Sequence, residues 1–117
     1  MFEGTSLVAG EWLGSEQTFQ NEPKSGSPDS FAAGTPDLIN RACGAAEEAF
    51  WSYGYSSIDH RAAFLEEVAA QIDARGADIT AIGTRETGLP EARLEGERGR
   101  TVAQLRMFAD HIKSGTS

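Results

Sequence analysis

The sequence has little of what disulfides, metal centres and membrane spans require. It contains one cysteine and two histidines among 117 residues, so Cys43 cannot form an internal disulfide and no CxxC or HExxH spacing exists for a metal. No apolar run approaches the roughly 20 residues of a membrane span, and the start, MFEGTSLVAG, lacks the basic segment and apolar core of a signal peptide. We therefore expect a cytoplasmic protein without a metal or membrane partner.

Basic residues are also in the minority. Ten Lys and Arg stand against 18 Asp and Glu, for a formal net charge of −8, whereas a nucleic-acid surface needs clustered cations that outweigh the acids. No nucleic-acid partner is expected. The length allows at most one domain with a modest core.

The first third of the chain predicts one hairpin followed by a loop. Residues 6–19, SLVAGEWLGSEQTF, place two short apolar pairs on either side of Ala9-Gly10, which can form a tight turn. Residues 20–34 are dense in Pro, Gly, Ser and Asp and predict a loop, with a brief extended piece near Phe31.

Residues 35–113 predict four helices. Thr35-Pro36-Asp37 supplies a cap, a proline for the first helical position and an acid for the positive end of the dipole. Ser57 caps the second helix. By these and similar signals the helices are expected at 35–54, 57–75, 77–86 and 90–113.

The fourth predicted helix has two distinct faces. One is an apolar stripe with Arg98 inside it, formed by Leu94, Thr101, Val102, Leu105, Phe108, Ala109 and Ile112. The opposite face is a groove of small residues, formed by Ala92, Gly96, Gly99 and Ala103, although each helical glycine costs roughly 1 kcal/mol against alanine. Both faces look suited to packing, and 117 residues offer little to cover both. The chain therefore looks like part of something larger.

Several segments together resemble the amino-terminal part of the aldehyde dehydrogenase superfamily. Within it, the similarity is to the branch of 2-oxoglutarate semialdehyde (2,5-dioxopentanoate) dehydrogenases and bacterial fatty aldehyde dehydrogenases. The segments that carry it are VAGEW, TPDLINRACGAAEEAF, HRAAFLEEVAAQIDARGADI with Arg61, ETGLPEARLEGERGRT and QLRMFAD.

The resemblance implies an α/β parent that oxidises a semialdehyde or aliphatic aldehyde to the acid with NAD or NADP, as a homodimer or homotetramer. Residues 1–117 would be a mainly helical, amino-terminal part of its cofactor-binding domain, with the rest of the polypeptide as partner. The family's nucleophilic cysteine, glutamate base and cofactor loop lie beyond its corresponding first quarter. No catalytic or cofactor-binding residue is therefore expected here, no cofactor should bind, and the fragment should be an inactive scaffold.

Four side chains invite a functional interpretation. Cys43 lies in an alanine-rich helix face and Glu86 at a helix end, and neither has a catalytic partner near it in the sequence, so we expect packing and capping roles. By resemblance, Arg100 aligns approximately with a position that lines the substrate channel, where Arg100 or Arg98 could bind a substrate carboxylate. Alternatively, Arg98 pairs with Glu95, Glu97 or a neighbouring helix, and Arg100 is solvated.

Two further interpretations stay open from the sequence. The alanine face of the first helix and the glycine groove of the fourth could belong to a non-enzymatic helical interaction module that docks a partner helix. The chain could also be a truncated gene product with no function.

Overall fold

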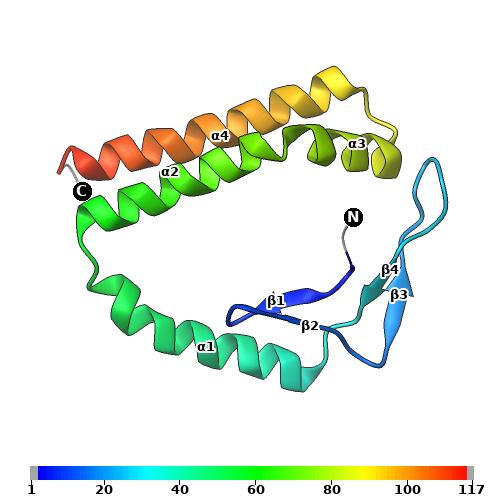
Figure 1. Cartoon of the computed structure of the whole chain (residues 1–117), viewed down its shortest axis with the longest axis horizontal. Coiled ribbons are helices and arrows are strands. Elements are labelled where there is room, and N and C mark those ends of the chain that lie inside the picture. The colour runs from blue at the N-terminus through cyan, green and yellow to red at the C-terminus, as the bar shows by residue number, and fades with distance from the viewer. Residues whose placement is uncertain (1–2, 116–117) are drawn as a thin grey trace. The chain divides into compact units, whose positions relative to one another are not determined.

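The computed structural model describes residues 3–115, which form four short strands and four helices (Figure 1). They fall into two compact units, Met1–Tyr55 and Ser56–Ser117, which are described separately. The first unit contains β1 (Ser6–Val8), β2 (Glu11–Leu13), β3 (Thr18–Gln20), β4 (Ser30–Ala32) and α1 (Pro36–Gly54). The second contains α2 (Ile58–Ala74), α3 (Gly76–Thr87) and α4 (Glu91–Lys113).

β1 and β2 form an antiparallel hairpin in which Ser6 lies opposite Leu13. Its two-residue turn is Ala9-Gly10, with φ values of 52° and 81°. Positive φ at both central residues is typical of the turn whose twist matches that of the strands. Val8 is the buried residue of this hairpin.

The prediction of a single hairpin over 6–19 was wrong, because the first hairpin ends at Leu13 and residues 18–20 belong to a second one. β3 pairs antiparallel with β4, and Phe19 stacks on Phe31 with ring centroids 5.5 Å apart. Part of the predicted 20–34 loop is therefore a strand, at the place where a brief extended piece was expected. The Ser15 hydroxyl donates to the carbonyl of Ala33 at 2.8 Å and helps to hold this second hairpin closed.

α1 has the predicted ends, but its apolar face is not buried within its unit. The Thr35 hydroxyl accepts a hydrogen bond from the Leu38 amide at 3.1 Å, and Pro36 occupies the first helical position. No residue of α1 is buried, and both Ile39 and Phe50 are more than half exposed. An exposed ion pair of 3.1 Å joins Arg41 to Glu11 on β2.

α2 and α4 pack along a narrow seam, and in Figure 1 α4 runs beside both α2 and α3. Partly or fully buried residues recur three or four positions apart, a spacing similar to that of a coiled-coil interface. On α2 and the start of α3 they include Ala62, Leu65, Ala69, Ile72 and Gly76, and on α4 they include Leu94, Arg98, Val102, Leu105, Ala109 and Ile112. Ala69 and Ala109 are 0% exposed, and their small side chains let the two backbones approach closely.

The seam is narrower than the predicted apolar stripe of the fourth helix. Thr101 and Phe108 are exposed, the latter by 53%, because each lies about 100° around the helix from a buried seam residue. α3 begins at Gly76 and ends at Thr87, close to the expected limits, and Gly88 follows with a left-handed φ of 74°. The three residues 88–90 then reverse the chain into α4.

Candidate functional site

Arg98 lies inside the seam and binds the junction between α2 and α3. Its Nη1 donates to the carbonyl oxygen of Gly76 at 2.8 Å and to the hydroxyl oxygen of Thr80 at 2.7 Å. Among the alternatives for this arginine, the observed partner is the neighbouring helix. Glu97 instead forms an ion pair with Arg93, whose Nε lies 3.8 Å from Oε1 of Glu97.

The two acceptors are arranged to receive this guanidinium, and we call Arg98, Gly76 and Thr80 the Arg98 cluster. Thr80 is 5% exposed and is the buried polar residue of the described chain. A Cβ atom at Gly76 would lie 2.7 Å from Cζ of Arg98, so the missing side chain makes room for the arginine. Arg75, which precedes α3, gives it no side-chain cap, and the cluster therefore lies at a weakly capped helix start.

Arg100 has a different environment. It is exposed, and within residues 3–115 it makes no hydrogen bond or ion pair. About 200° of rotation separates it from Arg98 on the helix. The two arginines named by sequence reasoning are therefore not brought together: one contacts α3 and the other faces outward.

The small-residue face of α4 is uncovered within its unit. Ala92, Gly96, Gly99 and Ala103 are all exposed, and a Cβ added at either glycine would meet no atom within 4 Å. Both glycines lie inside α4, where backbone amides are used by the helix, so they do not form the strand-to-helix phosphate loop of a dinucleotide site. The residues present do not fit NAD or NADP.

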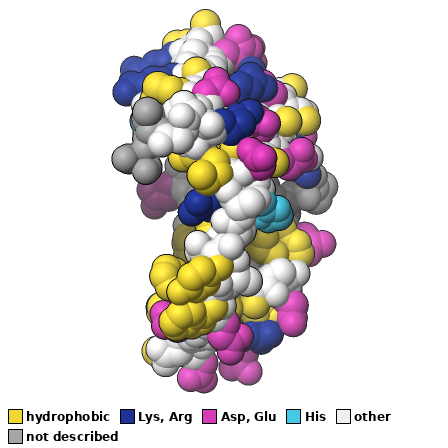
Figure 2. Space-filling view, turned by 90° about the vertical axis from the view of Figure 1, so that its left-hand side faces the viewer, with side chains coloured by type: hydrophobic (Ala, Val, Ile, Leu, Met, Phe, Trp, Pro, Cys, Tyr) yellow, Lys and Arg dark blue, Asp and Glu magenta, His cyan; other side chains and the backbone are white. Residues whose placement is uncertain are grey.

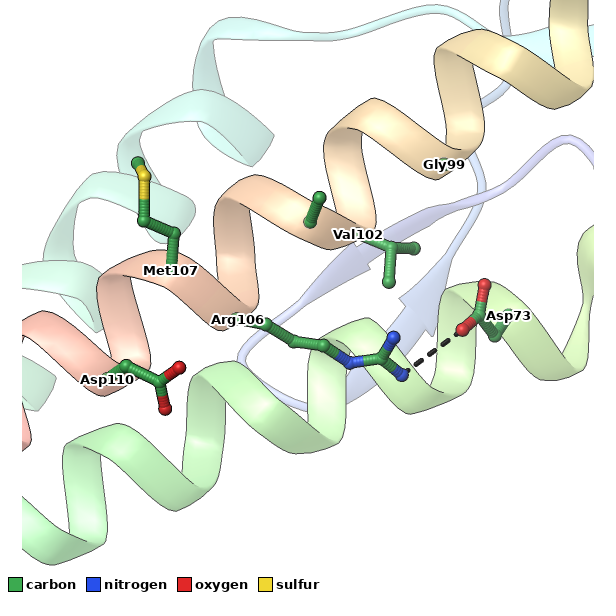
Figure 3. A pocket seen from close by; sticks show the side chains of 7 residues that line it. Asp73, Gly99, Val102, Arg106, Met107 and Asp110 are labelled. Carbon is green, nitrogen blue, oxygen red and sulfur yellow. Dashed lines mark hydrogen bonds and ion pairs between the residues drawn. The ribbon is translucent and has the colours of Figure 1, made fainter.

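A shallow groove of about 570 Å³ begins beside Gly99 and continues along α4 over Ala103, Met107 and Asp110 (Figure 3). Arg106 extends from α4 across to Asp73 of α2, and their 3.1 Å ion pair is the dashed contact in Figure 3. Both side chains are about half exposed. Both residues of the ion pair line the groove.

A second ion pair joins the end of α4 to the middle of α2. Nζ of Lys113 is 2.6 Å from a carboxylate oxygen of Glu66. The hydrogen bond to Glu66 raises the pKa of Lys113 above its ordinary value of 10.5. The ammonium group is exposed, so this contact is a surface interaction of small energetic weight.

The remaining chemically active side chains do not form a site. Cys43 is exposed on α1, and Glu86 is partly buried near the end of α3. In the part of the chain that the structure describes, no three His, Cys, Asp or Glu residues gather as metal ligands. Within the same residues, no helix has the length and apolarity needed to cross a membrane.

Large hydrophobic side chains are exposed, and Figure 2 shows several of them as a patch in the lower part of the view. On α1, Phe50 and Trp51 meet edge to face at 5.6 Å, and Trp51 stacks on Tyr55 at 6.4 Å. Each of the three is at least 60% exposed. In the second unit, Arg61 Nε and Thr84 Oγ1 are buried without a hydrogen-bond partner, which is uncommon in complete native structures.

Comparison with known proteins identifies the family. The aldehyde dehydrogenase family model matches residues 15–117. The chain is 42% identical, over 98% of its length, to a protein named alpha-ketoglutaric semialdehyde dehydrogenase 2 from Azospirillum brasilense. It is 41% identical, over 73% of its length, to the alpha-ketoglutaric semialdehyde dehydrogenase of Acinetobacter baylyi. The chain belongs to the aldehyde dehydrogenase family, which confirms the resemblance inferred from the sequence.

The matched region is a small part of those relatives. The alignments cover 22% of the Azospirillum protein and 16% of the Acinetobacter protein. The chain thus spans about a fifth of the length of the curated relatives it matches.

Proposed function

We propose that this chain is the amino-terminal segment of an NAD(P)-dependent aldehyde dehydrogenase that oxidises a semialdehyde or aliphatic aldehyde to the carboxylic acid. The observation that carries the proposal is the 42% identity over nearly the whole chain to a protein named for an α-keto semialdehyde. The proposed parent has the family's α/β fold, acts in the cytoplasm and assembles as a homodimer or homotetramer. Its cofactor is NAD or NADP, bound outside residues 1–117.

The proposed role of the segment is scaffolding, with the rest of the dehydrogenase polypeptide as its partner. The uncovered side chains of α1 and of the small-residue face support this role, as do the two buried polar atoms without partners. Exposed apolar patches on a domain usually mark a surface that another protein part covers.

The scaffold role is tested by assaying the purified chain beside a chimera. In the chimera, this chain replaces the matching segment of the Azospirillum relative. We expect aldehyde-dependent NAD(P)H production from the chimera and none from the 117-residue chain. Measurable production by the chain alone would refute the proposal, because it would place the catalytic groups within these residues.

Within the parent, we propose that α4 borders the substrate entrance and that Arg100 binds the distal carboxylate of an acidic semialdehyde. Its exposure and its lack of a partner within residues 3–115 support this role, since a free guanidinium can form a two-pronged pair with a carboxylate. Arg98 was the second candidate. Its Nη1 already donates to α3, which favours Arg100 as the group that touches substrate.

The carboxylate role is tested in the same chimera. Arg100→Ala should lower kcat/KM for an acidic semialdehyde by about ten- to a hundredfold, the size of a lost charge-assisted hydrogen bond, and leave an uncharged aldehyde of similar length nearly unaffected. Arg98→Ala is measured beside it, and Arg93→Ala serves as the control because Arg93 is an exposed arginine of α4 paired with Glu97. Equal effects of Arg100→Ala on both aldehydes would contradict the role.

A helical interaction module is the second candidate function, favoured by the open face at Gly96 and Gly99. The coding sequence after Ser117 separates the two. Several hundred further codons with a cysteine and a glutamate in family context support the enzyme, whereas a stop codon supports the module or a truncated product.

A further inference from the structure

The turn of α4 that contains two glycines has a low helix propensity. Residues 96–100 read GERGR, and each interior glycine weakens a helix by about 1 kcal/mol relative to alanine. Between the inward-facing Leu94 and Val102, Arg98 is the one residue of α4 that is not exposed. Its contacts with α3 are therefore what holds this turn against the rest of the unit.

Those contacts are directional, unlike the apolar contacts of the seam. One guanidinium nitrogen donates to both the Gly76 carbonyl and the Thr80 hydroxyl. A hydrogen bond fixes both the distance and the angle of its donor, so the cluster sets the rotation of this turn about the helix axis. Arg100 is two residues away, about 200° further around, and its outward direction follows from that rotation.

We propose that Arg98 is a positioning residue: it binds residues 96–100 of α4 to the α2–α3 junction and thereby fixes where the Arg100 guanidinium lies. This inference rests on the proposed function, in which Arg100 contacts the substrate carboxylate. Arg98 itself does not touch substrate. Gly76 contributes to the same positioning, since a Cβ at that position would come too close to the Arg98 guanidinium and force it to move.

The contact between Arg98 and the α2–α3 junction is tested first, by hydrogen exchange of the backbone amides of the 117-residue chain. Arg98→Met keeps a long apolar stem and removes the donors, so exchange at 96–100 and 76–80 should rise about tenfold or more, the size of a lost hydrogen bond to a charged group. Arg106→Met is the matched control, the same change on the same helix at an exposed ion pair, and should alter exchange there less than twofold. Unchanged exchange in Arg98→Met would overturn the proposal.

Two gentler variants serve if Arg98→Met does not fold. Thr80→Val removes one acceptor at nearly constant volume, and Arg98→Lys keeps the charge and one donor group. Both should raise exchange at 96–100 by less than Arg98→Met would, and Arg98→Lys should retain part of the protection. Wild-type protection in both variants would overturn the proposal.

The positioning step is tested in the chimera by kinetics. Arg98→Met should raise KM for the acidic semialdehyde about fivefold or more, within the range of a lost charge-assisted contact, while kcat and the KM of an uncharged aldehyde stay within about twofold. In an Arg100→Ala background, Arg98→Met should have no further effect on KM. An equal rise in KM for both aldehydes, or full additivity with Arg100→Ala, would overturn the positioning role.

These measurements also separate the two proposals. If Arg100→Ala leaves the KM of the acidic semialdehyde unchanged, the carboxylate role of Arg100 is refuted, and the positioning role that depends on it falls too. The exchange experiment still decides by itself whether Arg98 binds the glycine-containing turn to the α2–α3 junction.

Discussion

Replacing glycine by alanine should have opposite effects at two positions of the same helical unit. At Gly96 an added Cβ meets no atom within 4 Å, so Gly96→Ala gains only the higher helix propensity of alanine. That gain is about 1 kcal/mol in the free energy of unfolding. At Gly76 the same Cβ would lie 2.7 Å from Cζ and 2.9 Å from Nε of Arg98, so the guanidinium must move.

The magnitude at Gly76 follows from what the guanidinium loses by moving. It donates to Gly76 and Thr80 at 2.8 and 2.7 Å, and a hydrogen bond to a charged group contributes about 1.5–3 kcal/mol. The propensity gain at the first residue of α3 is at most about 1 kcal/mol. If one of these hydrogen bonds is lost, Gly76→Ala should therefore lower the free energy of unfolding by about 0.5–2 kcal/mol, the difference between these two effects.

The assay is urea unfolding of the 117-residue chain, followed by far-ultraviolet circular dichroism, with both variants and the unmodified chain measured side by side. The urea midpoint should be highest for Gly96→Ala, intermediate for the unmodified chain and lowest for Gly76→Ala. If Gly76→Ala unfolds at or above the midpoint of the unmodified chain, the Arg98 cluster does not stabilise the unit and this reasoning is refuted.

Three further predictions address other parts of the chain. Gly96→Ala and Gly99→Ala should stabilise the isolated chain yet destabilise the chimera, where the proposed partner surface covers this face; stabilisation in both, measured by thermal melting, would show that the face stays open. Ala9→Asn should stabilise the first hairpin by a few tenths of a kcal/mol or more, because Ala9 has a φ of 52° that asparagine tolerates better; the readout is the exchange protection of β1 and β2, and a loss of protection would contradict it. The raised pKa of Lys113 means that its contact with Glu66 stabilises the fold below pH 10.5 and is lost as the pH rises through the folded-state pKa; an NMR titration of Lys113 should show its pKa fall in Glu66→Gln, and an unchanged pKa would rule the contact out in solution.

Local signals in the sequence predicted the ends of the helices well. Thr35 and Ser57 accept hydrogen bonds from the amides three residues later, and Gly88 adopts the left-handed conformation that ends α3. These features depend on backbone groups within one turn of the residue itself. The residues adjacent in the sequence are therefore enough to predict them.

Pairing between distant segments was harder to predict. The strand at 18–20 was assigned to the first hairpin because it follows directly in sequence, but its partner is 30–32. That choice depends on contacts such as the Phe19–Phe31 stack, which join residues separated by the loop of residues 21–29. Similarly, the sequence left Arg98 with three kinds of partner, and the reversal of the chain at 88–90 brought Gly76 and Thr80 to it.

The sequence by itself determined the family of this protein, the number of its helices and the two-faced character of the fourth, because family motifs, caps and periodicity are all written in residues close together along the chain. Only the tertiary structure decided that Arg98 is bound to α3 while Arg100 faces outward, and that the small-residue face is uncovered within its unit. The physical reason is that a side chain's partner is set by which acceptor atoms the fold brings within hydrogen-bonding distance, and the Thr80 hydroxyl and the Gly76 carbonyl lie 18 and 22 residues away from Arg98 along the chain.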